Sequence, residues 1–141
     1  MDLQLQRLHP KAITPKYNHP GDAGMNLFTY EERTLAPGER YAFSTGWAMA
    51  FPPEYVARVL DRSGLSLKTG LHCLGGVIDS NYRGEWKIIM ANLGDQPYTV
   101  QAGDKIAQVV FLPIEIASPT IVDVLNESAR GTGGFGSTGN R

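Results

Sequence analysis

Short apolar runs separated by glycine and proline constrain the fold of this chain more than any other feature of its sequence. Its 141 residues include 16 glycines and 9 prolines, spread from end to end, and no segment keeps the apolar period of a long helix. Strand-like runs lie at residues 3–6, 47–51, 55–60, 86–90 and 106–111, on both sides of a Pro-Gly turn within 35–41, and more weakly at 98–100 and 120–124. The pattern predicts one all-β domain, a jelly-roll-like barrel or sandwich whose only helical candidate is 64–68.

The charge balance and the cysteine content bound the partners and the compartment. With 13 basic and 14 acidic residues the formal net charge is −1, whereas non-specific nucleic-acid binders are usually basic. The single cysteine, Cys73, allows no intramolecular disulfide, and although it follows His72 no second Cys/His pair completes a zinc site. The longest apolar run, 109–114, is too short to span a membrane. We expect a cytoplasmic protein (of the host cytoplasm or nucleus, if viral) with no nucleic-acid and no membrane partner.

The C-terminal residues 130–139 have a composition that cannot build a core. Five glycines surround a single large apolar side chain, Phe135, with Arg130 before it and the hydroxyls of Ser137 and Thr138 behind it. An aromatic ring, a guanidinium and bare backbone N–H groups can close over a base and its phosphates. The segment predicts a flexible flap that orders on a nucleotide, and a disordered Gly/Ser terminus is the alternative.

Two segments combine a glycine with polar side chains beside a predicted strand. Residues 22–27 place Asp22 and Asn26 on either side of a glycine, which by itself also fits an ordinary turn into a strand. Residues 62–66, Arg-Ser-Gly-Leu-Ser, directly follow a strand-like run. Outward N–H groups, a hydroxyl and a forked guanidinium make this a candidate phosphate cradle, and an N-cap at Ser63 beside a surface arginine fits equally well.

Two further segments place single polar groups beside apolar ones. In 75–86, Asp79 follows a Val-Ile pair and Tyr82 stands three residues later, which suits a carboxylate held next to a ring that packs on a sugar face. A β-hairpin with a turn of Asp, Ser and Asn is the compatible structural interpretation. In 103–108, Gln108 interrupts an apolar run and needs either a ligand or an internal hydrogen-bond partner.

Together these segments resemble the five motifs of the trimeric dUTPase family, the deoxyuridine triphosphate nucleotidohydrolases. The resemblance covers residues 17–138 and is carried by Arg-Ser-Gly-Leu at 62–65, Gly-Val-Ile-Asp-x-x-Tyr-Arg-Gly-Glu at 76–85, Ile-Ala-Gln at 106–108 and the glycine-rich tail. It implies a homotrimer of jelly-roll subunits with three shared active sites that hydrolyse dUTP to dUMP and pyrophosphate, assisted by Mg²⁺. Such an activity limits uracil incorporation into DNA and supplies dUMP for dTMP synthesis. The jelly-roll domain would span 1–126 and the flap 127–141.

The resemblance also implies roles for single residues. Asp79 matches the catalytic aspartate, which would orient a water and take its proton during in-line attack on the α-phosphorus. Asp22 and Asn26 would contact Mg²⁺ indirectly, through water. The residues that match substrate-binding positions are Arg62, Ser63, Gly64 and Gln108 on the phosphates, Gly76 near the uracil, Tyr82 under the deoxyribose, Phe135 stacked on the uracil, and Arg130, Gly136, Ser137 and Thr138 in the flap. One subunit would supply the phosphate motifs, a second the Asp79 segment and a third the flap.

Three positions depart from the family pattern. Asn26 stands where many relatives have a second aspartate, Asn81 replaces a frequent aspartate, and Asp61 stands where proline is common. We expect these changes to tune affinity, because Asp79 and Arg62 remain; the Asp61 carboxylate either weakens the arginine beside it or points away. The alternatives are a dCTP deaminase, which would need a glutamate acid/base, a nucleotide-gated regulator that binds a partner protein, and a purely structural jelly roll.

Overall fold

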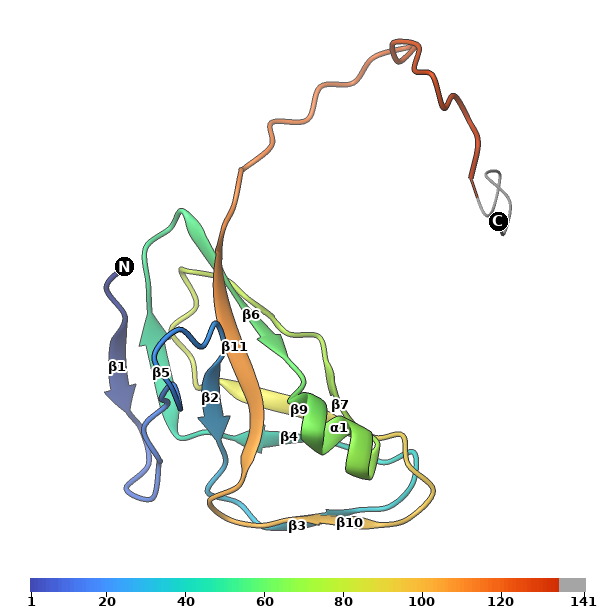
Figure 1. The fold of residues 1–141 in the computed structure, drawn as a ribbon. Coiled ribbons are helices and arrows are strands. Elements are labelled where there is room, and N and C mark those ends of the chain that lie inside the picture. Colours follow the sequence, from blue (N-terminus) through green and yellow to red (C-terminus); the bar gives the residue numbers. More distant parts are fainter. Residues whose placement is uncertain (135–141) are drawn as a thin grey trace.

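A computed structural model describes residues 1–134 of the chain, as eleven strands and one short helix (Figure 1). The first five strands are β1 (Gln4–Arg7), β2 (Met25–Phe28), β3 (Arg33–Leu35), β4 (Arg40–Ser44) and β5 (Trp47–Ala50). The middle of the chain forms β6 (Tyr55–Leu60), α1 (Ser63–Thr69), β7 (Leu71–Leu74) and β8 (Val77–Ile78). The last strands are β9 (Lys87–Asn92), β10 (Tyr98–Val100) and β11 (Lys105–Pro113).

The strands of residues 1–134 form four open antiparallel sheets rather than one closed barrel. Two sheets are two-stranded ribbons, β1 with β5 and β3 with β10. The third has the order β4-β9-β7, and the fourth and largest has the order β2-β11-β6-β8. This arrangement confirms the predicted jelly-roll-like, all-β fold with little helix.

The core lies between the inward faces of these sheets. Strand β6 alternates as a strand with one solvent face must, because Ala57 and Val59 are buried while Arg58 between them is exposed. Trp86 is fully buried and meets Phe51 edge to face, with ring centroids 6.2 Å apart. Truncation of either ring to alanine would cost about 3–5 kcal/mol of stability.

The only helix of residues 1–134 begins directly after β6. It covers the predicted range 64–68, so that prediction is confirmed. Gly70 ends it in a left-handed conformation (φ 75°), where glycine has no steric penalty, and its N–H donates to the Ser66 carbonyl at 2.8 Å. The described part of the chain contains no helix of the length and apolarity that a membrane crossing requires.

The β-hairpin interpretation of 75–86 is right about the turn at Asp79–Tyr82, where the Tyr82 N–H donates to the Asp79 carbonyl, but wrong about the strand pairing. Strand β8 pairs with β6, with Ile78 opposite Ala57, whereas β9 pairs with β4 and β7. Gly76 permits this pairing, because its φ is +92° and a Cβ there would lie 2.6 Å from the Val59 carbonyl oxygen. Because β8 pairs with β6, β8 belongs to a different sheet from β9.

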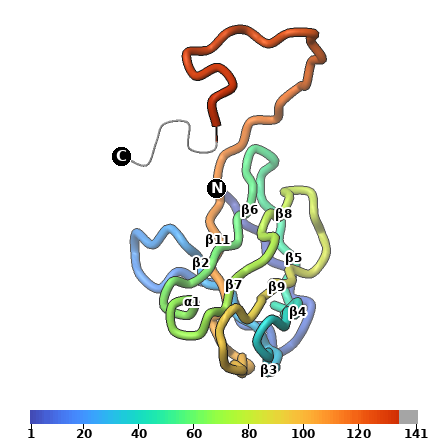
Figure 2. Tube along the Cα trace, turned by 90° about the vertical axis from the view of Figure 1, so that its right-hand side faces the viewer, coloured from blue at the N-terminus to red at the C-terminus, as the bar shows by residue number. Residues whose placement is uncertain are grey.

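The expected strand at 120–124 is also wrong. After β11 the chain leaves the body as an extended segment, residues 114–134, which we call the C-terminal arm (Figures 1 and 2). Ile121 is 100% exposed and Val124 83% exposed. A strand needs a neighbour for its backbone hydrogen bonds, and residues 120–124 pair with no strand within residues 1–134, because the arm's backbone contact with the body stops at the Ile114 N–H, which donates to the Glu54 carbonyl at 3.0 Å. The division of the chain into 1–126 and 127–141 stays a prediction.

Candidate functional site

Six predicted site residues meet in one pocket of about 350 Å³ beside the β2-β11-β6-β8 sheet. We call it the β2–β11 pocket. Its lining residues are Asn18, Asp22, Ala23, Gly24, Asn26, Arg62, Ser63, Gly64 and Gln108. The sheet register gathers them, because Gln108 of β11 lies between its partners Asn26 of β2 and Leu60 of β6. Residues distant in sequence therefore form one polar surface.

The side chain of Gln108 joins two walls of the pocket. Its Nε2 donates to the backbone carbonyl of Asp61 at 2.8 Å. Its Oε1 faces Gly24, where an added Cβ would overlap it and lie 2.8 Å from the Gln108 Cδ. The glutamine that interrupts the apolar strand thus has an internal partner on its donor side, and the absence of a side chain at Gly24 makes room for its acceptor.

Arg62, Ser63 and Gly64 form the wall at the start of α1. Arg62 holds the N-cap position with an extended backbone, and its Nη1 donates to the Lys105 carbonyl at 3.1 Å. Ser63 is already helical and no described side chain caps the helix, so the alternative of Ser63 as N-cap is wrong. The Leu65 N–H donates to the Arg62 carbonyl at 2.9 Å, whereas the Ser63 and Gly64 N–H groups have no acceptor among the described residues of the helix. A Cβ at Gly64 would meet nothing within 4 Å. This wall offers a guanidinium, a hydroxyl and backbone donors to an anion.

Asp22 and Asn26 add a carboxylate and an amide to the pocket wall. The Asp22 Oδ2 accepts the N–H of His19 at 2.9 Å and that of Asn18 at 3.2 Å, so the carboxylate shapes its own loop. Asn26 is buried, and its Nδ2 donates to the Lys16 carbonyl at 3.2 Å. Residues 1–134 hold no group of three His, Cys, Asp or Glu side chains suited to a metal ion. A hard cation at this pocket would need further oxygens from water or from a ligand.

One contact beside the pocket was not predicted. The Lys105 Nζ donates to the Asn18 Oδ1 at 2.8 Å, which ties the loop before β2 to the start of β11. The turn-rich sequence Asn-His-Pro-Gly-Asp at 18–22 places Asn18 on a loop. No sequence signal near that loop indicates its contact with Lys105, which lies 87 residues away.

The Asp61 carboxylate points away from the β2–β11 pocket. Its Oδ1 accepts the N–H of Cys73 at 2.6 Å and its Oδ2 lies 2.7 Å from the His72 Nδ1, so both oxygens are directed to β7. Burial by itself raises the pKa of Asp61, but the hydrogen bonds from His72 and Cys73 outweigh it and hold the pKa below its ordinary value. Burial, with the nearby carboxylate, raises the pKa of the Cys73 thiol far above its usual range.

Asp79, Gly76 and Tyr82 do not line the β2–β11 pocket. Strand β8 forms one edge of the sheet and β2 the other, which separates them by about 14 Å at three strand spacings. Ile78, directly before Asp79, lies opposite Ala57 of β6, and Ala57 is five residues, roughly 17 Å along an extended chain, from Arg62. Within one chain, the predicted catalytic carboxylate and the pocket are therefore apart.

The turn after β8 is held by its own hydrogen bonds. The Asp79 carbonyl accepts the N–H of Tyr82 at 3.1 Å, and the Tyr82 hydroxyl donates to the Glu85 carbonyl at 3.2 Å. The Arg83 Nη1 donates to the carbonyls of Ser80 at 2.7 Å and Tyr82 at 2.9 Å. These bonds fix the backbone while the Asp79 side chain stays exposed.

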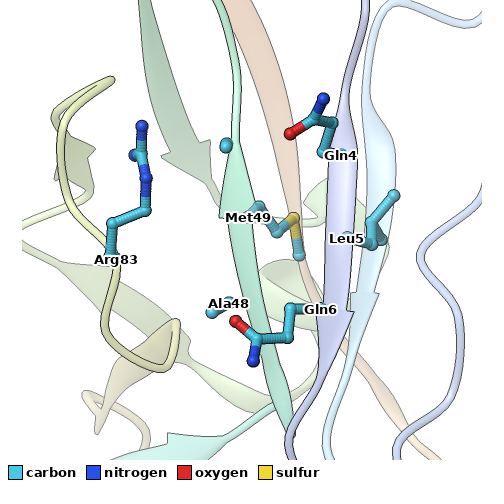
Figure 3. A pocket seen from close by; sticks show the side chains of 7 residues that line it. Gln4, Leu5, Gln6, Ala48, Met49 and Arg83 are labelled. Atoms are coloured by element: carbon cyan, nitrogen blue, oxygen red, sulfur yellow. The ribbon is translucent and has the colours of Figure 1, made fainter.

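A second hollow, of about 290 Å³, lies against the β1–β5 ribbon (Figure 3). Gln4 and Gln6 of β1 line it together with Met49 of β5, and Arg83 of the turn after β8 lies beside β5. None of the predicted site residues lines this hollow. It is therefore not the place where the motifs converge.

The flap residues are described only in part. Arg130 lies on the exposed C-terminal arm, where its Nε donates to the Gly133 carbonyl at 2.7 Å, and it does not line the β2–β11 pocket. Phe135, Gly136, Ser137 and Thr138 lie outside the described residues, so their predicted roles stay predictions.

Fold and pocket together define an all-β, jelly-roll-like protein with a polar pocket suited to an anion. The dUTPase family model matches residues 10–139 of the chain. A deoxyuridine 5'-triphosphate nucleotidohydrolase of Wolinella succinogenes is 45% identical over 141 residues, covering 99% of this chain and 95% of the relative. Its counterpart from a Picosynechococcus species is 44% identical and covers 99% of both chains. The chain therefore belongs to the dUTPase family.

Solved structures agree with this assignment. The dUTPase of Staphylococcus bacteriophage 80alpha with dUpNHpp superimposes with a TM-score of 0.92, at 31% identity and covering 98% of each chain. A mutant dUTPase of the Staphylococcus aureus phage phi11, described with a structural Mg(II) ion, gives a TM-score of 0.84 at 29% identity and covers 90% of this chain and 100% of that one.

Proposed function

We propose that this chain hydrolyses dUTP to dUMP and pyrophosphate. The observation that carries the proposal is the convergence of Arg62, Ser63, Gly64 and Gln108 on the β2–β11 pocket. A guanidinium, a hydroxyl and the N–H groups of Ser63 and Gly64 together bind phosphate oxygens and stabilise charge that develops toward a pyrophosphate leaving group. Membership of the dUTPase family and the names of the relatives support dUTP as the nucleotide.

A homotrimer with shared sites supplies what one chain lacks. Asp79 and the pocket are separated in the single chain, so a neighbouring subunit has to bring its Asp79 to this pocket. The outer face of the β2-β11-β6-β8 sheet exposes apolar side chains on both sides of Arg58, with Leu60 38%, Val77 58% and Leu112 46% exposed. Exposed apolar surface next to an incomplete site favours packing of further copies there.

In the assembled site Asp79 acts as the general base. Its exposed carboxylate, on a turn held by its own hydrogen bonds, orients a water and takes its proton as the water attacks the α-phosphorus in line. Tyr82, three residues later, packs under the deoxyribose, where a 2′-hydroxyl would clash. Gly76 and its neighbours bound the uracil. Phe135 stacks on the base while Arg130, Gly136, Ser137 and Thr138 close over the phosphates and exclude bulk water.

Mg²⁺ fits this site as an ion that binds the triphosphate of the substrate rather than one coordinated directly by protein side chains. When bound to the triphosphate, the ion neutralises phosphate charge and fixes the chain of phosphates in one conformation. Asp22 and Asn26 are oxygen-bearing side chains on the pocket wall, and both would reach the ion through water. Because Asn26 carries no charge, its contribution to ion affinity is smaller than that of a carboxylate.

The physiological role follows from the reaction. Removal of dUTP limits uracil incorporation into DNA, and the dUMP released is a precursor of dTMP. A cytoplasmic protein could perform both, and this location remains part of the proposal.

Pyrophosphate release tests the proposal directly. The purified chain is incubated with dUTP, dTTP, dCTP or UTP, each with and without Mg²⁺. Selective, Mg²⁺-assisted release from dUTP is expected. Equal release from all four nucleotides would contradict the base and sugar selectivity, and no release from a folded trimer would contradict the activity.

A further inference from the structure

Asp61 bonds to three residues on two different elements. Its backbone carbonyl accepts the Gln108 Nε2 at 2.8 Å, and Gln108 lines the β2–β11 pocket. Its carboxylate accepts the Cys73 N–H at 2.6 Å and lies 2.7 Å from the His72 Nδ1, both on β7. Asp61, between β6 and Arg62, is therefore anchored to β7 by its carboxylate and holds Gln108 by its backbone carbonyl.

The position of this carboxylate has an electrostatic consequence. Asp61 immediately precedes Arg62, whose guanidinium lines the pocket. An acid turned toward that pocket would repel phosphates and compete for the guanidinium. The contacts with His72 and Cys73 occupy both carboxylate oxygens and direct the charge to the other side of the turn.

We propose that Asp61 is a positioning residue, paired with His72, which aims its own carbonyl at Gln108 and keeps its negative charge out of the β2–β11 pocket. The inference rests on the proposed function, because it assigns the triphosphate to this pocket. An aspartate at this place brings a charge that has to be accommodated, and the bonds to β7 accommodate it.

The pairing makes a specific prediction about ligands. The β2–β11 pocket would bind the β- and γ-phosphates that dUMP lacks. A disturbed Asp61 should therefore weaken binding of the non-hydrolysable dUTP analogue dUpNHpp much more than binding of dUMP. A general loss of structure would weaken both nucleotides alike.

Calorimetric titration of the full-length protein with dUpNHpp and dUMP, with Mg²⁺ present, tests the proposal. Asp61→Ala removes the anchor and should weaken dUpNHpp binding about tenfold while changing dUMP binding less than about threefold. Asp61→Asn keeps an acceptor for the Cys73 N–H and a group that can bond His72, so it should bind dUpNHpp within about twofold of wild type. Asp95→Ala, which removes an exposed acid elsewhere, is the matched control and should change neither.

A double-mutant cycle isolates the charge. His72→Ala leaves the carboxylate with one partner and frees it to turn toward Arg62, so dUpNHpp binding should weaken about tenfold. His72 is exposed, so its removal leaves the core unchanged. Adding Asp61→Asn to His72→Ala removes the charge and should restore most of the binding. Failure of this rescue would overturn the proposed role of the pair.

The remaining outcomes separate the two proposals. If the wild-type protein binds both dUpNHpp and dUMP, and Asp61→Ala binds dUpNHpp as tightly as the wild type does, the positioning role alone would be overturned. An equal loss for dUpNHpp and dUMP in a variant that melts at the wild-type temperature would overturn it too. A wild-type protein that binds neither nucleotide and releases no pyrophosphate would overturn the proposed function, and with it this inference.

Discussion

Gly24 lies so close to Gln108 that a β-carbon at position 24 would overlap the Gln108 side-chain oxygen. Nothing in the backbone of Gly24 requires glycine, because its φ is not in the left-handed region. The requirement comes from the opposite strand, where the Gln108 amide needs that space to reach the Asp61 carbonyl.

Gly24→Ala should therefore damage the site more than the fold. The methyl group displaces Gln108, and loss of its bond to Asp61 should cost about 1 kcal/mol of stability and about tenfold in kcat/KM for dUTP. Thermal melts and steady-state kinetics measure the two effects. In a Gln108→Ala background Gly24→Ala should have little further effect, and a full additional loss would contradict the proposed contact.

Gly64→Ala should raise the stability of the fold while weakening the binding of nucleotide. A Cβ at Gly64 meets nothing within 4 Å, and alanine is favoured over glycine in a helix by about 1 kcal/mol. The variant should melt at a higher temperature, yet bind dUpNHpp more weakly, because the methyl group narrows the wall where phosphates approach. Unchanged affinity in a stabilised variant would show that the substrate does not come close to Gly64.

Asp79→Asn should abolish turnover without loss of binding. The Asp79 side chain is exposed, and the turn is held through the backbone carbonyl of Asp79, so the amide leaves the fold intact. Loss of a general base should lower kcat by about 100- to 10,000-fold while dUpNHpp affinity stays near wild type. Asp95→Asn serves as the surface control, and substantial residual kcat in Asp79→Asn would assign the base to another group.

A mixing experiment tests whether the site is shared between chains. Asp79→Asn and Arg62→Ala are each expected to be inactive alone. In trimers re-formed from an equal mixture, a site that takes Asp79 from one chain and Arg62 from another is intact in about a quarter of cases. Activity near that fraction of wild type is expected. A mixture as inactive as its components would mean that both residues act within one chain.

Asp61 should also make stability depend on pH. Its pKa is held below the ordinary value of 3.8 by the bonds from His72 and Cys73, so its charged form stabilises the fold. This contribution is fully present above about pH 5 and is lost as pH falls through the folded-state pKa. The melting temperature of wild type should therefore exceed that of Asp61→Asn near neutral pH, and the difference should shrink below about pH 4. A difference independent of pH would point to hydrogen-bond geometry rather than charge.

The sequence by itself determined the local structure and the residue types of the site. Apolar alternation between turn residues located β6 and β10, and the segment after Leu60 was correctly predicted as a short helix. These features depend on neighbours within a few residues, which is why a pattern can find them. The motif content also selected the residues that line the β2–β11 pocket before any of them could be placed together.

Only the tertiary structure decided which of these residues meet. A strand pairs through hydrogen bonds to a distant segment, so its register cannot be read from its own residues. The register of β11 brings Gln108 beside Asn26, whereas that of β8 carries Asp79 to the far edge of the same sheet. The apolar segment at 120–124 reads as a strand but finds no partner within residues 1–134. The direction of the Asp61 carboxylate was likewise undetermined, because its partners on β7 approach it only once the chain has folded.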